Sequence, residues 1–389
     1  MMKKITSFLL IAGVLSSCGG PASDTQPQPA AADTTQTATG PRSETFADTL
    51  DGKAAHLYEL HNGNIRALIT SYGGRLVSLF VPDKNGKETD IVAGFDSLDG
   101  YRGAKSSYFG ALIGRYGNRI GHGTFKLDGK GYQIPVNNNG NALHGGTRGF
   151  DDYVWDGDKR NDSTLELTFL SRDGDMGFPG NLSVKVTYTL TGHTGLKIGY
   201  TANTDAKTVV NLTNHAYYNL NGAGSGTILQ HKLQVYGTAY TPVDSLLIPT
   251  GKIAPVAGTP LDFTKATAIG DRINMDNEQL KFGKGYDHNF VIGNGKPSDT
   301  LRHAGTVWAD GSGIVMDIYS MEPGLQFYTG NFMDGTHAMK YGKHDDHRTA
   351  FCVETQHFPD SPNEPAWPTT ELDPGKSYHT VTLYTFSAK

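Results

Sequence analysis

Two histidines and one glutamate stand where they could transfer protons. His144 precedes two glycines, His215 lies inside a polar run that reads like a strand, and Glu354 interrupts an apolar segment. Histidine and glutamate side chains are common general acids and bases near neutral pH. Taken singly, each histidine is more often a hydrogen-bonded structural residue, so neither predicts a catalytic site by itself.

Glu354 is harder to explain as a surface residue. Phe351 and Val353 lie close before it in the chain, so the carboxylate should be at least partly buried. A buried carboxylate is costly without a partner, and it normally has a defined role or a nearby cation. Arg119, which follows Asn118 between two glycines, could be that cation in a purely structural ion pair.

The segments that would position these groups have the period of β-strands. Apolar and polar residues alternate over 182–190, as in a strand with one buried face. The same period recurs in Leu165–Phe169, Leu196–Tyr200, Ile314–Ile318 and Val381–Leu383. Asp128 and Gly129 lie between two short apolar segments and predict a hairpin turn.

Helical signals are weak throughout the sequence. No stretch of a dozen residues combines a 3.6-residue period with capping signals. The 49 glycines, 19 tyrosines and 17 phenylalanines favour strands joined by tight turns. The sequence therefore predicts an all-β fold, and its 389 residues suggest a large antiparallel β-sandwich and not a small barrel.

Charge excludes one class of partner. Lys and Arg number 34 against 39 Asp and Glu, which gives a formal net charge of −5. No basic stretch beyond the first residues could follow a phosphate backbone. We expect no nucleic-acid partner.

The N-terminus has the layout of a secretory signal. Two lysines precede a short apolar run and small residues that end at Cys18, which resembles a bacterial lipobox. We predict a lipoprotein signal peptide over residues 1–17, a lipidated Cys18 opening a flexible tether over 18–44, and one domain over 45–389. The alternative is an ordinary signal peptide with an incidental cysteine. Cys352 is the only other cysteine, so lipidation of Cys18 leaves no intramolecular disulfide.

Cell location follows from the same segment. Gly19 and not an aspartate follows the cysteine, which resembles lipoproteins routed to the outer membrane. We expect a protein of the bacterial cell envelope that is anchored to the membrane by lipid, faces the periplasm or the exterior, and is a monomer.

Seven segments together carry a resemblance to a known family. From about Thr45 to the C-terminus the sequence resembles the galactose mutarotase (aldose 1-epimerase) family, whose motifs it repeats in order. These segments are Asn118–Ile120, Leu143–Gly146, Asn211–His215, Gly258–Asp262, Tyr286–Phe290, Pro323–Asn331 and Val353–Gln356.

The resemblance implies a fold and a set of residue roles. The family's fold is a large antiparallel β-sandwich with an open cleft on one sheet. Matched position by position, Glu354 is the general base, His215 the general acid, and His144 assists at the ring oxygen of the sugar. The positions matched to groups that hold sugar hydroxyls are Asn118, Arg119, Asp262 and Gln326.

The implied reaction opens and recloses an aldose ring. A base removes the proton of the anomeric hydroxyl while an acid protonates the ring oxygen, and each positioned group typically contributes about 10²–10⁴-fold. Glu354 should therefore start ionised and His215 protonated. The reaction requires no metal or organic cofactor. The expected substrate is a small free sugar such as galactose or glucose.

Other functions remain open on the sequence alone. The domain could be a non-catalytic carbohydrate-binding module, or a glycosidase that uses Asp262 and Glu354 as its carboxylate pair. A hexose-phosphate mutarotase should show extra Arg or Lys around the cleft. The run 344–347, His-Asp-Asp-His, looks like a metal motif, but without a third-ligand pattern we interpret it as a solvated loop.

Overall fold

The computed structural model describes residues 40–104, 107–192 and 194–389. The signal peptide, Cys18 and most of the tether that the sequence predicts lie outside the described residues. The first element, a 3-10 helix η1 (Ser43–Phe46), includes the last two residues assigned to that tether and buries Phe46 completely. No helix in the described ranges is long and apolar enough to cross a membrane.

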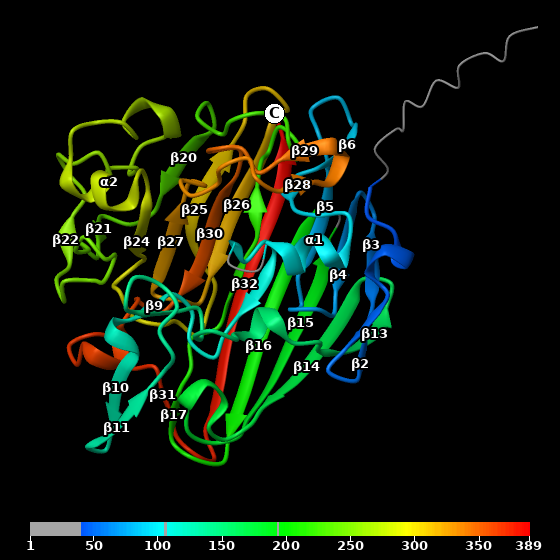
Figure 1. Cartoon of the computed structure of the whole chain (residues 1–389). Helices are drawn as coiled ribbons and strands as arrows, with labels where there is room; N and C mark the ends of the chain where they lie inside the picture. Colours follow the sequence, from blue (N-terminus) through cyan, green and yellow to red (C-terminus); the bar gives the residue numbers. More distant parts are fainter. Residues whose placement is uncertain (1–39, 105–106, 193) are drawn as a thin grey trace, which may run out of the picture. The chain divides into compact units, whose positions relative to one another are not determined.

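The three largest sheets of the described chain are antiparallel (Figure 1). The largest has nine strands, in the order β13 (Asp156–Asn161), β14 (Thr164–Ser171), β15 (Leu182–Thr191), β16 (Gly195–Thr204), β32 (Ser377–Ala388), β26 (Ile314–Ser320), β25 (Arg302–Trp308), β20 (Lys232–Val235) and β23 (Thr267–Ala268). The second has seven, in the order β22 (Ala254–Pro255), β21 (Ala239–Tyr240), β24 (Asp287–Val291), β27 (Gly324–Tyr328), β30 (Phe351–Gln356), β19 (Tyr217–Tyr218) and β7 (Val92–Ala93). The third has β3 (Leu57–Asn62), β4 (Ile65–Thr70), β5 (Leu76–Pro82) and β6 (Glu88–Asp90).

Short elements fill the space around these sheets. The two-stranded pairs are β1 (Asp48–Leu50) with β2 (Lys53–Ala55), β8 (Ala111–Ile113) with β18 (Thr213–His215), β9 (Arg119–Ile120) with β12 (Ala142–Leu143), β10 (Thr124–Leu127) with β11 (Lys130–Gln133), β17 (Thr208–Val209) with β31 (Glu371–Leu372), and β28 (Ala338–Met339) with β29 (Lys343–His344). The described α-helices are α1 (Leu98–Gly103) and α2 (Glu278–Gly283), six residues each.

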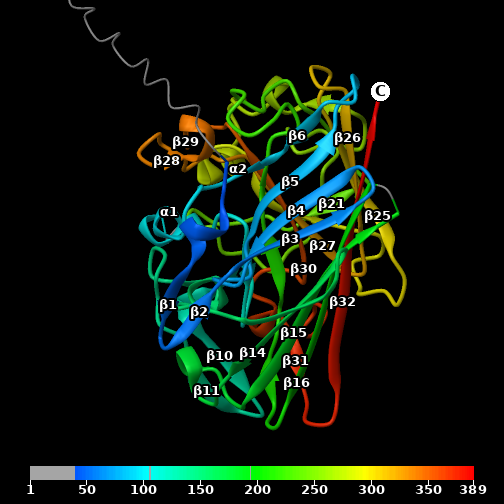
Figure 2. The same ribbon diagram turned by 90° about the vertical axis from the view of Figure 1, so that its right-hand side faces the viewer.

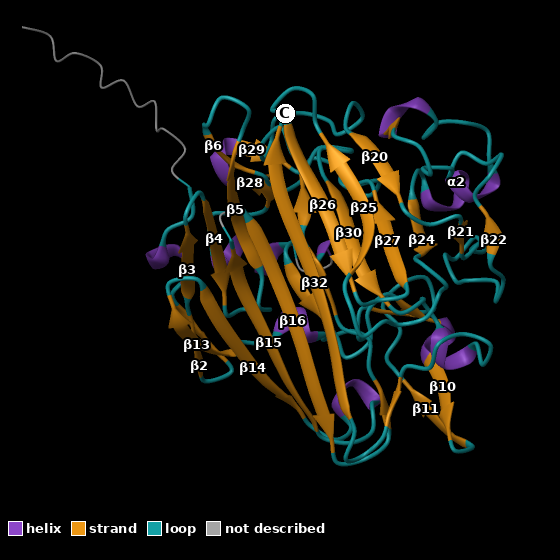
Figure 3. Ribbon diagram, turned by 180° about the vertical axis from the view of Figure 1, so that it is seen from behind, coloured by secondary structure: helices purple, strands orange, loops and turns teal. Residues whose placement is uncertain are grey.

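The nine-stranded and seven-stranded sheets pack face to face. Seen from behind, the long strands from β13 to β20 form one continuous layer (Figure 3), and the view turned by 90° shows β27 and β30 beside this layer (Figure 2). The contact is direct, because the Tyr384 hydroxyl of β32 donates to the Val353 carbonyl of β30. Apolar side chains of both sheets form one buried cluster. The predicted all-β sandwich is confirmed.

The alternation that predicted the strands is confirmed in most of them. In β15, Leu182, Val184, Val186, Tyr188 and Leu190 are all buried, while the residues between them are exposed or half-buried. The predicted turn at Asp128–Gly129 joins β10 to β11, with both residues at positive φ. This is the backbone that a two-residue hairpin turn requires.

One strand buries the face opposite to its apolar pattern. Val381 and Leu383 of β32 are only half-buried, whereas Thr380, Thr382 and Tyr384 are buried. Since β32 lies in the middle of the nine-stranded sheet, its inner face contacts the seven-stranded sheet through polar groups such as the Tyr384 hydroxyl. The strand prediction was right, and the implied buried face was wrong.

Candidate active site

A cavity of about 430 Å³ is lined by strands of the seven-stranded sheet and by the short strands β9, β12 and β18. Its lining includes five of the residues that the sequence assigns to the site: Asn118, Arg119, His144, His215 and Glu354. These residues belong to four separate segments of the chain. Arg119 begins β9 and Asn118 directly precedes it, His144 follows β12, His215 ends β18, and Glu354 lies in β30. The fold therefore brings together side chains separated by more than 200 positions in sequence.

Strand register sets the direction of Glu354. In β30, Glu354 pairs with Gln326 of β27, which in turn pairs with Asn289 of β24. Residues paired across antiparallel strands share one face of the sheet, so these three polar side chains form a row. The adjacent Thr355 points to the opposite face, where its hydroxyl meets that of Thr382 in the other sheet. Alternation thus turns Glu354 away from the apolar core and into the cavity.

Glu354 and His215 form a close acid–base pair. His215 Nε2 lies 3.6 Å from Glu354 Oε1, and both residues are at most 5% exposed. Burial, reinforced by the like charge of Asp287, raises the pKa of Glu354 well above its ordinary value, although Arg119 opposes the shift. Burial lowers the pKa of His215 from 6.5 to about 4.

These shifts differ from the charge states that the sequence predicted. Both favour the uncharged forms, with the carboxyl of Glu354 protonated and His215 neutral, because desolvation disfavours an isolated charge on either group. The pair in this state nevertheless carries one proton more than a carboxylate beside a neutral imidazole. Moving that proton from Glu354 to His215 gives the ionised pair without exchange with solvent.

His144 is held in one tautomer by the backbone. The N–H of Asn118 donates to His144 Nδ1 at 3.1 Å, so the ring proton of the neutral imidazole sits on Nε2. Burial and the neighbouring His215 and Arg119 lower the pKa of His144 well below its usual range. The ring planes of His144 and His215 are nearly perpendicular, with centroids 5.2 Å apart. His144 is therefore equipped to donate a hydrogen bond.

Several residues that line the cavity have unusual backbone conformations. Tyr108, Asn118 and His144 all have positive φ, between 53° and 62°. Such conformations are uncommon outside glycine and cluster at functional sites. Gly145 follows at φ 95°, and a Cβ atom there would meet the Gly114 carbonyl oxygen at 2.1 Å, so only glycine fits.

Charged and amide side chains contact one another along another wall of the cavity. Arg119 Nη1 lies 3.9 Å from Asp287 Oδ2, and Gln326 Nε2 donates to Asp287 Oδ1 at 2.6 Å. Arg119 Nε also donates to Asn138 Oδ1. Gln326 does not line the cavity, and it contacts the site through Asp287.

Asp287 lines the cavity, and the sequence reasoning did not select it. It lies in the segment Tyr286–Phe290, one of the seven that carry the family resemblance, but no role was given to it. The signal that could have identified it is an aspartate at the start of an otherwise buried strand, β24. A buried carboxylate in such a place needs a partner, and Arg119 provides one.

The structure does not bring Asp262 to the cavity. The carboxylate of Asp262 accepts hydrogen bonds from the N–H and hydroxyl of Thr264, and its carbonyl oxygen accepts from Arg272. Those bonds hold it within its own turn, and it is absent from the cavity lining. Asp262 therefore lies outside the lining of the cavity that holds Glu354, and its sugar-binding role and its pairing with Glu354 in a glycosidase remain predictions that this lining does not support.

Aromatic side chains surround the acid–base pair. Tyr217 lines the cavity with its ring 5.1 Å from that of His215, whereas Phe327 is completely buried in the core. The Tyr108 ring packs edge-on against His144 at 4.6 Å, and Phe332 is half exposed at the rim. Apolar walls of this kind exclude water from the pair and fit the apolar face of a sugar.

Two groups of side chains in the described ranges have metal-ligand atoms within 4.8 Å of one another. The first is His144, His215 and Glu354, but the Asn118 N–H keeps the proton of His144 on Nε2, which leaves no lone pair there for a metal. The second is Asp334, His337 and Asp345, in which His337 Nδ1 already pairs with Asp345 Oδ2 at 2.8 Å.

The run 344–347 is not a uniformly solvated loop. His344, Asp346 and His347 are exposed, as expected, but Asp345 is buried against the ring and backbone N–H of His337. Asp345 orders the turn that carries Asp334 and His337 along one edge of the cavity. The sequence pattern did not distinguish this one buried aspartate from its neighbours.

Comparisons by family model, by sequence and by structure all find similarity to aldose 1-epimerases and galactose mutarotases. The family model described as Aldose 1-epimerase matches residues 56–385. Galactose mutarotase from Bos taurus is 43% identical over 330 residues, which cover 85% of this chain and 93% of the bovine protein. Aldose 1-epimerase from Escherichia coli strain K12 is 36% identical over 352 residues, which cover 89% of this chain and 99% of that protein. The crystal structure of a GalM/aldose epimerase homologue from C. elegans superimposes with a TM-score of 0.79 at 31% identity, covering 86% of this chain and 99% of the other.

Proposed function

The chain belongs to the aldose 1-epimerase family, and we propose that its cavity interconverts the α and β anomers of a free aldose by opening and closing the sugar ring. The observation that carries this proposal is the pair of His215 and Glu354, 3.6 Å apart in a cavity that also presents Arg119 and Asp287. Acid–base groups and hydroxyl-binding groups are what this isomerisation needs.

The proton-transfer sequence uses the proton that the pair carries beyond a carboxylate and a neutral imidazole. With that proton on His215, the Glu354 carboxylate takes the proton of the anomeric hydroxyl as the C1=O bond forms. The C1–O5 bond breaks, and O5 takes the proton from His215. After rotation about C1–C2, O5 attacks the other face of the aldehyde, returns its proton to His215, and O1 recovers its proton from Glu354.

His144 and the charged wall supply orientation. His144 Nε2–H is available to donate to the ring oxygen as it gains charge, which eases bond breaking. Arg119 and Asp287 are suited to bind hydroxyls away from C1, because charge-assisted hydrogen bonds fix a sugar while C1 remains free to turn.

A non-catalytic carbohydrate-binding module is the second candidate on this fold. Binding alone would not require a histidine and a glutamate in contact, each made costly to ionise by burial. The pair therefore supports the enzyme over the module.

Polarimetry on freshly dissolved sugars tests the proposal. The purified chain should accelerate the change in optical rotation of α-galactose and α-glucose, with α-xylose and arabinose included to find the preferred aldose. Rates equal to those in buffer, together with measurable sugar binding, would establish the binding module in its place.

We also propose, from the sequence, that the mature protein is a monomeric lipoprotein of the bacterial envelope, lipidated at Cys18 and routed to the outer membrane. Cys18→Ala should leave the chain unlipidated with residues 1–17 still attached. Intact-mass analysis and membrane fractionation measure both properties. An identical mature mass for wild type and variant, or fractionation with inner-membrane markers, would contradict the assignment.

A further inference from the structure

The side chain of Asn211 bonds to Gly117 and to His357, which belong to two segments that carry site residues. It is fully buried and does not line the cavity. Its Oδ1 accepts from the backbone N–H of His357 at 3.0 Å, and its Nδ2 donates to the carbonyls of Gly117 at 3.1 Å and His357 at 3.4 Å. Every hydrogen of the amide thus has a backbone acceptor.

The partners of Asn211 lie close in sequence to residues of the site. Gly117 immediately precedes Asn118 and Arg119, and His357 follows Glu354 by three residues. Asn211 itself lies four residues before His215. Its backbone also pairs with the first segment, since the Gly117 N–H donates to the Asn211 carbonyl at 2.7 Å.

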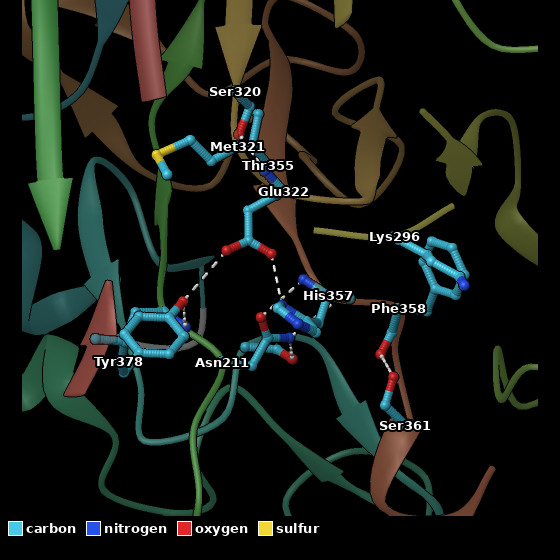
Figure 4. Close-up of polar contacts among 12 residues, drawn as sticks. Asn211, Lys296, Ser320, Met321, Glu322, Thr355, His357, Phe358, Ser361 and Tyr378 are labelled. Atoms are coloured by element: carbon cyan, nitrogen blue, oxygen red, sulfur yellow. Dashed lines mark hydrogen bonds and ion pairs between the residues drawn. The ribbon is translucent and has the colours of Figure 1, made fainter. Parts of the chain in front are cut away.

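A closed ring of polar contacts fixes this junction. His357 Nδ1 lies 2.6 Å from Glu322 Oε2, the Tyr378 hydroxyl donates to Glu322 Oε1, and the Leu212 N–H donates to the Tyr378 oxygen. Figure 4 shows the Glu322 carboxylate between Tyr378 and His357, with Asn211 beside His357. The ring returns to Asn211 through the peptide that joins it to Leu212.

We propose that Asn211 is a positioning residue for the isomerase reaction, which holds Glu354, His215 and the Asn118–Arg119 turn in their relative places. The inference rests on the proposed function. Proton transfer needs heavy atoms within hydrogen-bond reach, and a misplacement of about 1 Å can lower the rate by about 10²-fold. The three backbone bonds of one amide prevent such a displacement.

The test compares Asn211→Asp with Asn219→Asp. Asp has nearly the same size as Asn, but at position 211 it would set a carboxylate oxygen against the Gly117 and His357 carbonyls in place of two donors. Asn219 is an equally buried asparagine whose Nδ2 donates to the carbonyls of Gly226 and Thr349, outside the cavity. It is the matched control for a purely structural amide.

We expect the kcat of Asn211→Asp on saturating galactose to fall by about 10- to 100-fold and its KM to rise, at a temperature where circular dichroism shows the fold intact. Asn219→Asp should keep its kcat within about twofold while its Tm falls. Asn211→Ser, which lacks the repulsion, provides the same comparison if the aspartate variant does not fold. Unchanged kcat in the folded Asn211 variants, or equal loss of kcat in Asn219→Asp, would overturn the positioning role. Absence of activity in the wild type would instead refute the proposed function.

Discussion

Two buried glutamate–histidine pairs each include a residue at the C-terminal end of β30, Glu354 within the strand and His357 directly after it, and they differ in what surrounds them. Glu354 and His215 are 3.6 Å apart and face a cavity, and the pKa of Glu354 is raised. Glu322 and His357 are 2.6 Å apart and enclosed. Burial alone would raise the pKa of Glu322 too, but the charge and hydrogen bond of His357, with help from neighbouring hydroxyls, lower it.

The difference shows that burial alone does not set the direction in which the pKa of a buried glutamate shifts. Asp287 adds a like charge beside Glu354, whereas the Tyr378 hydroxyl donates to Glu322. The pKa of the Glu354 carboxyl is thereby raised, which favours its protonated form, while the pKa of Glu322 is lowered, which favours its anion. The second pair then supports the first through Asn211.

Equivalent substitutions in the two pairs should separate their roles most strongly. Glu354→Gln keeps the size of the side chain but removes the base, so kcat should fall by at least about 10²-fold while the domain stays folded. Glu322→Gln should change kcat far less, because it touches no substrate. Polarimetry at saturating galactose measures both. Equal losses in the two variants would erase the proposed distinction.

Removing the histidine of the enclosed pair should lower the stability of the fold. His357→Ala removes the partner that lowers the pKa of the buried Glu322 carboxyl, so this carboxyl must either stay charged without a partner or take up a proton, and we expect the free energy of unfolding to fall by about 3–5 kcal/mol. Urea denaturation at neutral pH measures the change. Addition of Glu322→Gln to this variant should restore part of the loss, because the unpaired charge is then absent. No restoration would mean that His357 stabilises through packing alone.

Arg119→Ala tests the cavity wall that binds hydroxyls. It removes a charge-assisted contact while leaving Glu354 and His215 in place, so we expect a loss of roughly 1.5–3 kcal/mol in transition-state binding, expressed mainly in KM. Steady-state polarimetry over a range of galactose concentrations gives both constants. If kcat and KM both keep their wild-type values, Arg119 serves only as a structural partner of Asp287.

The pH dependence of stability gives the smallest expected effect. Between pH 6.5 and about 4 the unfolded chain binds a proton at His215 that the folded chain does not, so stability falls as the pH is lowered through this window. His215→Asn should reduce that slope by up to about 1.4 kcal/mol per pH unit.

A second histidine provides the comparison for this slope. Burial also lowers the pKa of His231, which does not line the cavity, to about 4. His231→Asn should therefore reduce the slope similarly while leaving mutarotation unchanged. Denaturant titrations at several pH values measure the slopes, and unaltered slopes in both variants would contradict the shifts.

The sequence predicted what depends on local pattern. Alternation in β15 and the turn at Asp128–Gly129 follow from side-chain period and backbone preference, which act over a few residues. The ordered motifs predicted the residues of the acid–base pair. By contrast, Asp262 and Asp287 both lie in such motifs, and only the folded chain shows that Asp287, and not Asp262, reaches Arg119.

Local sequence pattern could not predict the charge states of the acid–base pair or the contacts that support the site. The predicted ionised Glu354 and protonated His215 took no account of desolvation, which depends on how completely other strands cover them. The Glu322–His357 pair joins residues 35 positions apart through side chains that no spacing rule connects. Such contacts are properties of the packed sheets.

The pairing of Gln326 with Glu354 limits how the protein can change its length. Successive residues of a strand face opposite sides, so one inserted or deleted residue within β27 or β30 could turn Gln326 or Glu354 to the core side and break the row that they form with Asn289. Insertions in evolution or engineering must therefore accumulate in the connections, such as the 22 residues between Tyr328 and Phe351, which include Asp334 and His337. Variation among aldose preferences should be concentrated in that connection, while the length of both strands stays fixed.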